Sequence, residues 1–175
     1  FDNNMRLFSI VKNHELYNLL NNSLKKNKFF RKKKSSFNNF LNDNNEVTIN
    51  CDPNSQLTKK FFNKSIKKRY YSIAYATIIK HKKIKKNNTA YQVFTKFGPI
   101  AFLPISESET SIVYSVKKNN KLNSYDIVNL VKKYNPKYFI TKFEIIENFE
   151  LTSSNLRFYN HKNILAFGDL LHRVH

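Results

Sequence analysis

The stretch "NTAYQVFTKFGPIAFLPISESETSIVYSV", Asn88–Val116, decides the predicted fold. It holds three runs of β-branched and aromatic residues, which begin at Thr89, Gly98 and Thr110. The connections "FGP" and "SESE" between these runs are short, so the three predicted strands pair as an antiparallel meander. Upstream, the alternating stretch "YYSIAYATIIK", Tyr70–Lys80, predicts a further long strand.

The segment that follows the meander predicts one helix and more sheet. Apolar residues at helical spacing predict a helix over 123–134, with Ser124 as its cap and Pro136 beyond its end. Residues 138–151 predict a strand region, and residues 156–159 predict a short strand.

The segment that precedes the meander predicts both a helix and short strands. Residues 6–26 carry leucines at the spacing of an amphipathic helix. Residues 27–45 are basic and rich in asparagine, and they favour two short strands joined by a turn at Lys34-Ser35. The stretch "EVTINC", Glu46–Cys51, predicts a short buried strand that leads into a turn over 52–55.

The last stretch, "NILAFGDLLHRVH", is the strongest candidate for a ligand site. Ile164–Phe167 predict a buried strand, and the residues from Leu170 onward predict a helix. Between them lie Asp169 and Gly168, one of only two glycines in the chain. A glycine at a strand end permits close backbone approach, and an aspartate beside it can accept hydrogen bonds from ligand hydroxyls. The residues alone leave open a ligand site and a capped turn.

The net charge of +19 invites a nucleic-acid interpretation, but the kind of cation argues against it. The chain has 26 lysines and 5 arginines, together with 26 asparagines, which indicates compositional drift. A chain that binds phosphates or bases would use more arginine, because the planar guanidinium group of arginine binds them bidentately. A basic nucleic-acid-binding module therefore stays the alternative hypothesis, and a basic face could also rest on anionic lipid.

Several other kinds of site are excluded or disfavoured. Cys51 is alone, so neither a disulfide framework nor a cysteine-based metal site can form. His172 and His175 share an i, i+3 spacing, but no third ligand is near them, so we expect packing and no metal. The sequence has no glycine-rich phosphate loop and no apolar run approaching a membrane span. We expect the acidic residues Glu144, Glu147 and Glu150 to lie on the surface.

The order of elements predicts an α/β domain with an inserted antiparallel sheet, an α+β arrangement. Residues 1–69 and 159–175 form the α/β part, and residues 70–158 form the inserted sheet with one helix. The chain starts without methionine and stops within a pattern, so we expect an internal fragment of a longer protein.

Two separated motifs resemble one family, the flavin-dependent aromatic hydroxylases of ubiquinone biosynthesis. The family reads Asn-Thr-Ala, then a Gln-x-Phe step, then Gly-Pro-Leu-Ala-Phe-Leu-Pro-Leu, then Ser-Ile-Val-Trp-Ser. Here these are Asn88-Thr89-Ala90, Gln92-Val93-Phe94, Gly98 to Ile105, and Ser111 to Ser115, with Tyr114 in place of the tryptophan. The stretch "ILAFGDLLHRVH" is similar to the family's Gly-Asp-Ala-Ala-His motif and the histidine that follows it.

The resemblance implies a group A flavoprotein monooxygenase with a partial FAD/NAD(P)-binding domain and a β-sheet substrate domain. It implies that Asp169 binds the ribityl hydroxyls of FAD, that Gly168 gives clearance, and that His172 and His175 shape the loop on the flavin side. Asp52 and Ser55 match the remnant of a family Asp-Gly motif associated with FAD and NAD(P)H, from which a residue is missing or a glycine replaced. The substrate cavity would be lined from the strand that carries Gly98, Pro99, Phe102 and Pro104.

The implied reaction is hydroxylation of a polyprenylated phenol ring with NAD(P)H and O2. The resemblance does not identify a catalytic residue, and the fragment is not expected to be active alone. The implied location is cytoplasmic or peripheral on the inner membrane, within a ubiquinone-biosynthesis complex and without a nucleic-acid partner. A related flavoprotein reductase that acts on prenyl chains is a further alternative.

Overall fold

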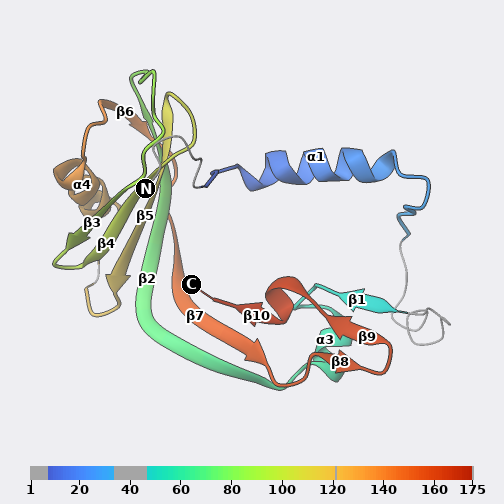
Figure 1. Cartoon of the computed structure of the whole chain (residues 1–175). Coiled ribbons are helices and arrows are strands. Elements are labelled where there is room, and N and C mark those ends of the chain that lie inside the picture. Colours follow the sequence, from blue (N-terminus) through green and yellow to red (C-terminus); the bar gives the residue numbers. More distant parts are fainter. Residues whose placement is uncertain (1–7, 34–46, 121, 175) are drawn as a thin grey trace. The chain divides into compact units, whose positions relative to one another are not determined.

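The computed structural model describes residues 8–33, 47–120 and 122–174, and this part of the chain is mostly sheet with few helices (Figure 1). The chain divides into two compact units. Unit 1 comprises Phe1–Phe30 and Ser72–Phe149, and unit 2 comprises Arg31–Tyr71 and Glu150–His175. Two of the three boundaries, at 71/72 and 149/150, fall inside long strands, and each unit is described by itself below.

Unit 1 is built on an antiparallel sheet, and the predicted meander is confirmed. Its three strands pair in sequence, with Tyr91 opposite Phe102 and Ile100 opposite Tyr114. The long strand β2 then pairs with β5, and β6 pairs with the end of β2. The bounds are β2 (Ser65–His81), β3 (Tyr91–Thr95), β4 (Gly98–Pro104), β5 (Glu109–Lys117) and β6 (Ile140–Phe143).

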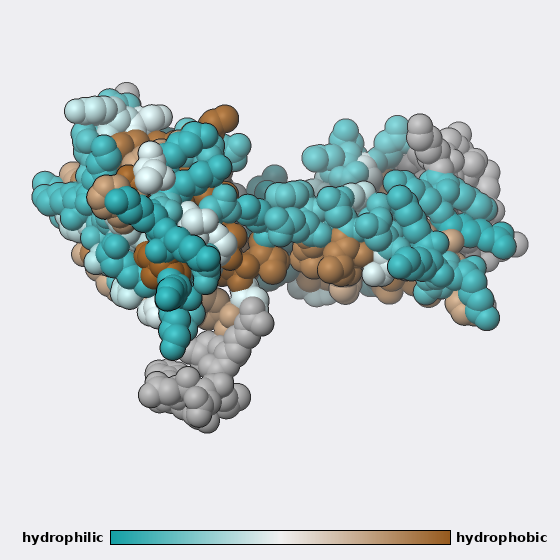
Figure 2. Space-filling view, turned by 90° about the horizontal axis from the view of Figure 1, so that it is seen from above, coloured by the Kyte–Doolittle hydropathy of each residue, from teal (hydrophilic) through white to brown (hydrophobic). Residues whose placement is uncertain are grey.

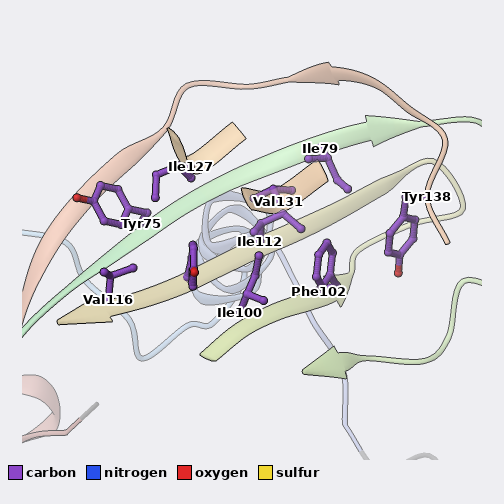
Figure 3. Close-up of a cluster of buried hydrophobic side chains, with 10 residues drawn as sticks. Tyr75, Ile79, Ile100, Phe102, Ile112, Val116, Ile127, Val131 and Tyr138 are labelled. Carbon is purple, nitrogen blue, oxygen red and sulfur yellow. The ribbon is translucent and has the colours of Figure 1, made fainter. Parts of the chain in front are cut away.

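One face of this sheet is covered by helix α4 (Ser124–Tyr134), and the core lies between them. Figure 3 shows apolar side chains from β2, β4 and β5 gathered with two from the helix. Alternation along a strand sends neighbouring residues to opposite faces. The buried core residues are Tyr75, Ile79, Ile100, Phe102, Ile112, Tyr114, Val116, Ile127, Val131 and Tyr138.

The start of α4 differs from the prediction. The cap is Asn123, whose side-chain oxygen accepts the Asp126 N–H at 2.9 Å. The Asp126 carboxylate in turn accepts the Asn123 N–H at 3.0 Å. Ser124 is therefore the first residue of the helix, because this reciprocal capping box satisfies two N–H groups where a serine cap would satisfy one.

Three strand predictions need correction. Strand β2 starts five residues before Tyr70, at Ser65, and passes through Tyr71 with a φ of 51°. Residues 138–151 hold two elements, β6 and the start of β7 (Glu147–Leu156). Leu156 ends β7, and the short strand beyond it is β8 (Asn160–His161), so no separate strand covers 156–159.

Unit 2 has a small sheet with strand order β1-β9-β8, and here β1 (Thr48–Asn50) and β9 (Ile164–Ala166) run parallel. Strands are present at both predicted places, although β1 is shorter than 46–51. The prediction that these strands are buried is wrong, because alternation exposes one face of each: Ile49 is 62% exposed and Leu165 is 42% exposed. Helix α3 (Gln56–Phe61) follows β1 and was not predicted. A buried cluster holds the unit together: Leu57, Phe62, Leu156, Ile164, Ala166 and Leu170.

The predicted C-terminal helix is wrong. Gly168–Leu170 form one 3-10 turn, η1, and His172–Arg173 form strand β10. The Leu171 N–H closes this turn on the Gly168 carbonyl, and beyond it the backbone bonds to β7: the Leu171 carbonyl accepts the Leu156 N–H at 3.1 Å, and His172 pairs with Asn155. A pairing with a distant strand overrides a locally helical pattern, because a first helical turn is costly to nucleate.

The amphipathic helix predicted over 6–26 is present as α1 (Asn13–Lys25). None of its residues is buried, and Figure 2 shows apolar side chains gathered along it beside hydrophilic ones. The exposed leucines are Leu16, Leu19, Leu20 and Leu24. The described residues 27–33 form no strand, and the rest of the segment predicted as two strands lies outside the described residues. Among the described helices, none is long and apolar enough to cross a membrane.

The turn between β3 and β4 is fixed by one glycine and one buried hydroxyl network. Gly98 has a φ of 141°, and a Cβ there would overlap the carbonyl oxygen of Ser115. Thr95 donates its hydroxyl proton to the Gly98 carbonyl at 2.8 Å. The fully buried Tyr114 hydroxyl, 2.8 Å from the Thr95 hydroxyl, must therefore be the donor in that second bond.

We expect Gly98→Ala to lower the free energy of unfolding by about 3 kcal/mol, because the new methyl group meets backbone and the φ is strained. Gly168→Ala is the matched control: its φ of 64° is also positive, but a Cβ there meets nothing within 4 Å. We expect it to cost only about 1–2 kcal/mol. Urea unfolding of both variants checks this, and equal losses would contradict the close approach at Gly98.

We expect Tyr114→Phe to cost about 1 kcal/mol at neutral pH through the lost bond to Thr95. Burial raises the pKa of Tyr114 above its ordinary value of 10.0. The stability that the neutral hydroxyl contributes is thus complete below pH 10.0 and is lost as pH rises through the higher folded value. Wild type should lose more stability than Tyr114→Phe between neutral and strongly alkaline pH. The exposed control Tyr125→Phe should follow wild type, and identical alkaline profiles for all three would refute the argument.

Candidate functional site

The parallel pairing of β1 with β9 brings two distant segments to one edge of the sheet. Thr48 lies opposite Ile164 and Asn50 opposite Ala166. The Phe167 N–H donates to the Asn50 carbonyl at 3.0 Å, just beyond the paired residues. The segments that follow the two strands therefore leave the sheet side by side, at the carboxyl edge where open α/β sheets place their ligands.

The turn after β1 is held by a buried side-chain network around Asn50. The Asn50 amide donates to the Thr58 hydroxyl at 2.8 Å, and its oxygen accepts from the Ser55 hydroxyl at 3.1 Å. Thr58 donates onward to the Asp52 carbonyl at 2.7 Å. Ser55 also accepts the Thr58 N–H, as the N-cap of α3. Each group has a partner, so the turn is rigid at the point where it enters the site.

After β9 the chain turns sharply at Gly168 and presents Asp169. The positive φ of Gly168 redirects the backbone, and the space where its Cβ would lie is open. Asp169 is exposed, and within the described part of the chain its carboxylate makes no hydrogen bond or ion pair. Leu170 is buried beside it and anchors the turn in the core of unit 2.

A groove of about 570 Å³ lies within unit 2, between α3, the first half of β2, the second half of β7 and the η1–β10 segment. Three buried apolar side chains are among the residues that line it: Phe62, Leu156 and Leu170. Two carboxylates line it, Asp169 and Glu150. Four cationic side chains line it as well: Lys59, Lys67, Arg69 and Arg173. Such a groove can accept hydroxyl donors at its carboxylates and anionic groups at its cations.

The predicted cofactor residues lie at or beside this groove. Asp169 lines it, next to Gly168. Asp52 does not line it, but the next two residues, Pro53 and Asn54, do. The Asp52 carboxylate accepts the Asn54 N–H at 2.8 Å and so shapes the turn. The prediction for His175 lies outside the described residues.

The predicted substrate residues belong to β4 in unit 1, and the strand divides them between two faces. Phe102 is 0% exposed and packs toward Tyr138, on the face covered by α4. Gly98 and Pro104 share that side by alternation. Pro99 lies on the opposite, partly exposed face, with Ala101 and Leu103 as its neighbours.

The three glutamates predicted on the surface differ in their contacts and exposure. Glu144 accepts from Lys142 at 3.0 Å and lies 3.3 Å from the Lys80 ammonium, and these bonds lower its pKa. Glu147 and Glu150 are exposed, as predicted. Among the described residues, no three His, Cys, Asp or Glu side chains gather as a metal-ligand group.

The four groove cations were missed by reasoning from the sequence. Compositional drift explains the net charge of the whole chain, but it does not single out the cations that lie in the groove. The available signal was the alternation of Ser65, Lys67 and Arg69, which places three polar side chains on one face of a strand. The scarcity of arginine was a second signal, since two of the five arginines lie here.

Comparison with known proteins identifies structures with a similar fold. No family model matches the chain. The solved structure of aklavinone-11 hydroxylase, in a ternary complex with FAD and aklavinone, has the same fold over 71% of the chain, with a TM-score of 0.52 and 11% identity. The flavin-dependent halogenase CmlS matches 72% of the chain, with a TM-score of 0.54 and 12% identity. The chain covers 25% and 26% of these two structures, so it spans about a quarter of their length.

One curated relative is similar in sequence. The mitochondrial ubiquinone biosynthesis monooxygenase COQ6 of Danio rerio is 35% identical over 71 residues, which are 40% of this chain and 15% of that protein. The resemblance to the hydroxylases of ubiquinone biosynthesis is thus confirmed by a sequence match, and the fold is one that flavin-dependent enzymes share.

We expect Thr58→Val to lower the free energy of unfolding by about 1–3 kcal/mol, because it leaves the buried Asn50 amide without its acceptor and removes one of the two bonds to the Asp52 carbonyl. Thr152→Val is the matched control, since Thr152 lies in the same unit and its hydroxyl makes no bond within the described residues. Urea unfolding measures both. A control variant that loses as much stability as Thr58→Val would show that the network does not hold the turn.

Proposed function

We propose that this chain is part of an FAD-dependent monooxygenase that hydroxylates a polyprenylated aromatic ring in ubiquinone biosynthesis, with NAD(P)H as electron donor and O2 as oxidant. The observation that carries the proposal is the position of Asp169. It follows a parallel strand, lines a groove and has no partner of its own in the described part of the chain. The sequence match to a ubiquinone biosynthesis monooxygenase supports the choice of reaction.

The residues present fit the polyhydroxylated chain of a flavin. Asp169 offers two carboxylate oxygens to hydroxyl donors, and charge-assisted bonds of this kind are strong. The open space beside Gly168 admits a ligand close to the backbone. Asp52 would act through the turn that it shapes, and His175 would lie on the flavin side.

The bound flavin would supply the oxygen-transfer chemistry, and the protein would position the ring and exclude water. On β4, Pro99 with Ala101 and Leu103 would contact the substrate, because their face is partly exposed. Gly98, Phe102 and Pro104 would support the strand from the covered face. Phe102 does so as part of the core.

The domain division that the sequence predicts is part of this proposal. Residues 1–69 and 159–175 would contribute to the FAD-binding domain, and residues 70–158 would form the substrate domain. The two compact units divide the chain at similar places in the two long strands, but they group Phe1–Phe30 with the sheet unit instead of with residues 31–71. A polyprenyl substrate resides in a bilayer, so the protein would act at a membrane surface, within a ubiquinone-biosynthesis complex.

We expect Asp169→Asn, in the protein that contains this chain, to weaken FAD binding by about tenfold or more, because an amide replaces a charged acceptor. Glu147→Gln is the matched control: it makes the same change of charge at an exposed position in unit 1. Titration of the apoprotein with FAD measures both. An unchanged affinity in Asp169→Asn would overturn the assignment of Asp169.

A further inference from the structure

A lysine-rich surface lies at the end of the unit 1 sheet where β2 ends and β6 begins (Figure 1). The loop after β2 carries Lys82, Lys85 and Lys86, and the segment before β6 carries Lys137 and Phe139. All five side chains are exposed, Phe139 by 62%. The Lys82 N–H donates to the Phe139 carbonyl at 3.0 Å, so the two segments lie side by side. These five residues are named the lysine surface.

The four lysines of this surface make no ion pair with any residue that the structure describes. Three glutamates lie near this end of the sheet, and each already pairs with a different lysine: Glu107 with Lys83, Glu109 with Lys12, and Glu144 with Lys80 and Lys142. Two lysines of the surface lie over aromatic rings instead, Lys82 over Phe139 at 4.1 Å and Lys137 over Tyr91 at 4.9 Å. Such a contact orients a cation and leaves its charge in place.

A buried hydrogen-bond network holds the backbone that carries these side chains. His81 is 4% exposed, its Nδ1–H donates to the Lys82 carbonyl at 2.9 Å, and its Nε2 lies 3.0 Å from the Thr110 hydroxyl. Asn87 donates to the same hydroxyl at 3.2 Å and accepts from the Tyr138 hydroxyl at 3.1 Å. The network therefore joins the loop after β2 to the segment before β6, and it fixes the two parts of the lysine surface against each other.

The side chains of the lysine surface favour an anionic membrane over a nucleic acid. All four cations are lysines, whose hydrated charges are attracted to anionic headgroups and need no bidentate geometry. The exposed Phe139 ring is of the kind that enters the boundary between headgroups and acyl chains. A site for a single-stranded nucleic acid would offer a row of rings on which successive bases stack, and this surface offers one ring.

We infer that the lysine surface docks unit 1 onto an anionic lipid bilayer, with Phe139 in the interface and the four lysines on the headgroups. Four unpaired positive charges and one exposed ring on a fixed backbone carry the inference. It deepens the proposed function, on which the presence of a bilayer partner rests, because it names the part of the chain that meets the membrane.

The test is cosedimentation of the protein that contains this chain with lipid vesicles at physiological ionic strength. One set of vesicles is phosphatidylcholine alone, and the other also contains the anionic lipid phosphatidylglycerol. We expect the wild type to prefer the anionic vesicles. We expect the triple variant Lys82→Gln, Lys85→Gln, Lys86→Gln to bind them about tenfold or more weakly, because it removes three charges at the bilayer surface.

The matched control is the triple variant Lys96→Gln, Lys117→Gln, Lys118→Gln, which changes the net charge equally at the opposite end of the same sheet. Lys96 lies in the turn before Gly98, and Lys117 ends β5. Lys117 is separated along β5 from Glu109 by roughly 27 Å, at about 3.4 Å per residue. Because this exceeds a Debye length of about 8 Å, the control should stay within about twofold of wild type.

A second pair of variants tests the ring without changing the charge. We expect Phe139→Ser to weaken binding to the anionic vesicles by about fivefold or more, because it removes the apolar group at the interface. Phe94→Ser is the matched control, since Phe94 is 80% exposed on β3 near the opposite end of the sheet. It should stay within about twofold of wild type.

Titration with FAD separates this inference from the flavin proposal. The Lys82, Lys85 and Lys86 triple variant should bind FAD as the wild type does, which also shows that it is folded. Asp169→Asn should bind anionic vesicles as the wild type does. Vesicle binding of this kind supports the lysine surface even where FAD binding fails.

Three outcomes would overturn the inference. The first is wild-type protein that binds neutral and anionic vesicles alike, or binds neither. The second is equal weakening in the two triple variants, which would show a diffuse effect of net charge. The third is binding of single-stranded DNA that is tighter than binding of anionic vesicles and that depends on the same three lysines, which would assign the surface to a nucleic acid.

Discussion

The parallel pairing of β1 with β9 determines where the elements of the groove lie. These strands are separated by more than a hundred residues, yet Asn50 lies opposite Ala166 and accepts the Phe167 N–H through its carbonyl. One strand leads into the Asn50–Ser55–Thr58 network and α3, and the other leads into Gly168 and Asp169. This pairing brings Asp169 and Lys59, the lysine of α3, to the same groove.

Both glycines of the chain lie where the backbone needs a positive φ, but they serve different purposes. Gly98 lets β4 approach the Ser115 carbonyl in β5, and the Tyr114–Thr95 bond closes the same turn. The result is a rigid sheet in unit 1. Gly168 has open space around it, so its turn exposes the backbone and Asp169 to the groove. One glycine therefore secures the scaffold, and the other opens the site.

Elements whose cause is local could be predicted from the sequence. The meander follows from alternation and short connections, and the Gly168-Asp169 turn follows from its residue types. Where the prediction failed, a distant partner or an overlooked cap was the reason. Leu170–Val174 has a helical pattern, but Leu171 and His172 bond to β7. Helix α3 was missed although Ser55 is a strong capping residue. The groove brings together Lys59, Lys67 and Arg173, although more than a hundred residues separate the first from the last. No local sequence pattern contains that information.

The central claim is that the groove beside Asp169 belongs to a flavin site. The most direct test is the flavin content of the purified protein that contains this chain, measured as flavin released on denaturation. We expect a yellow protein with one FAD for each chain. A colourless protein that takes up no added FAD would contradict it.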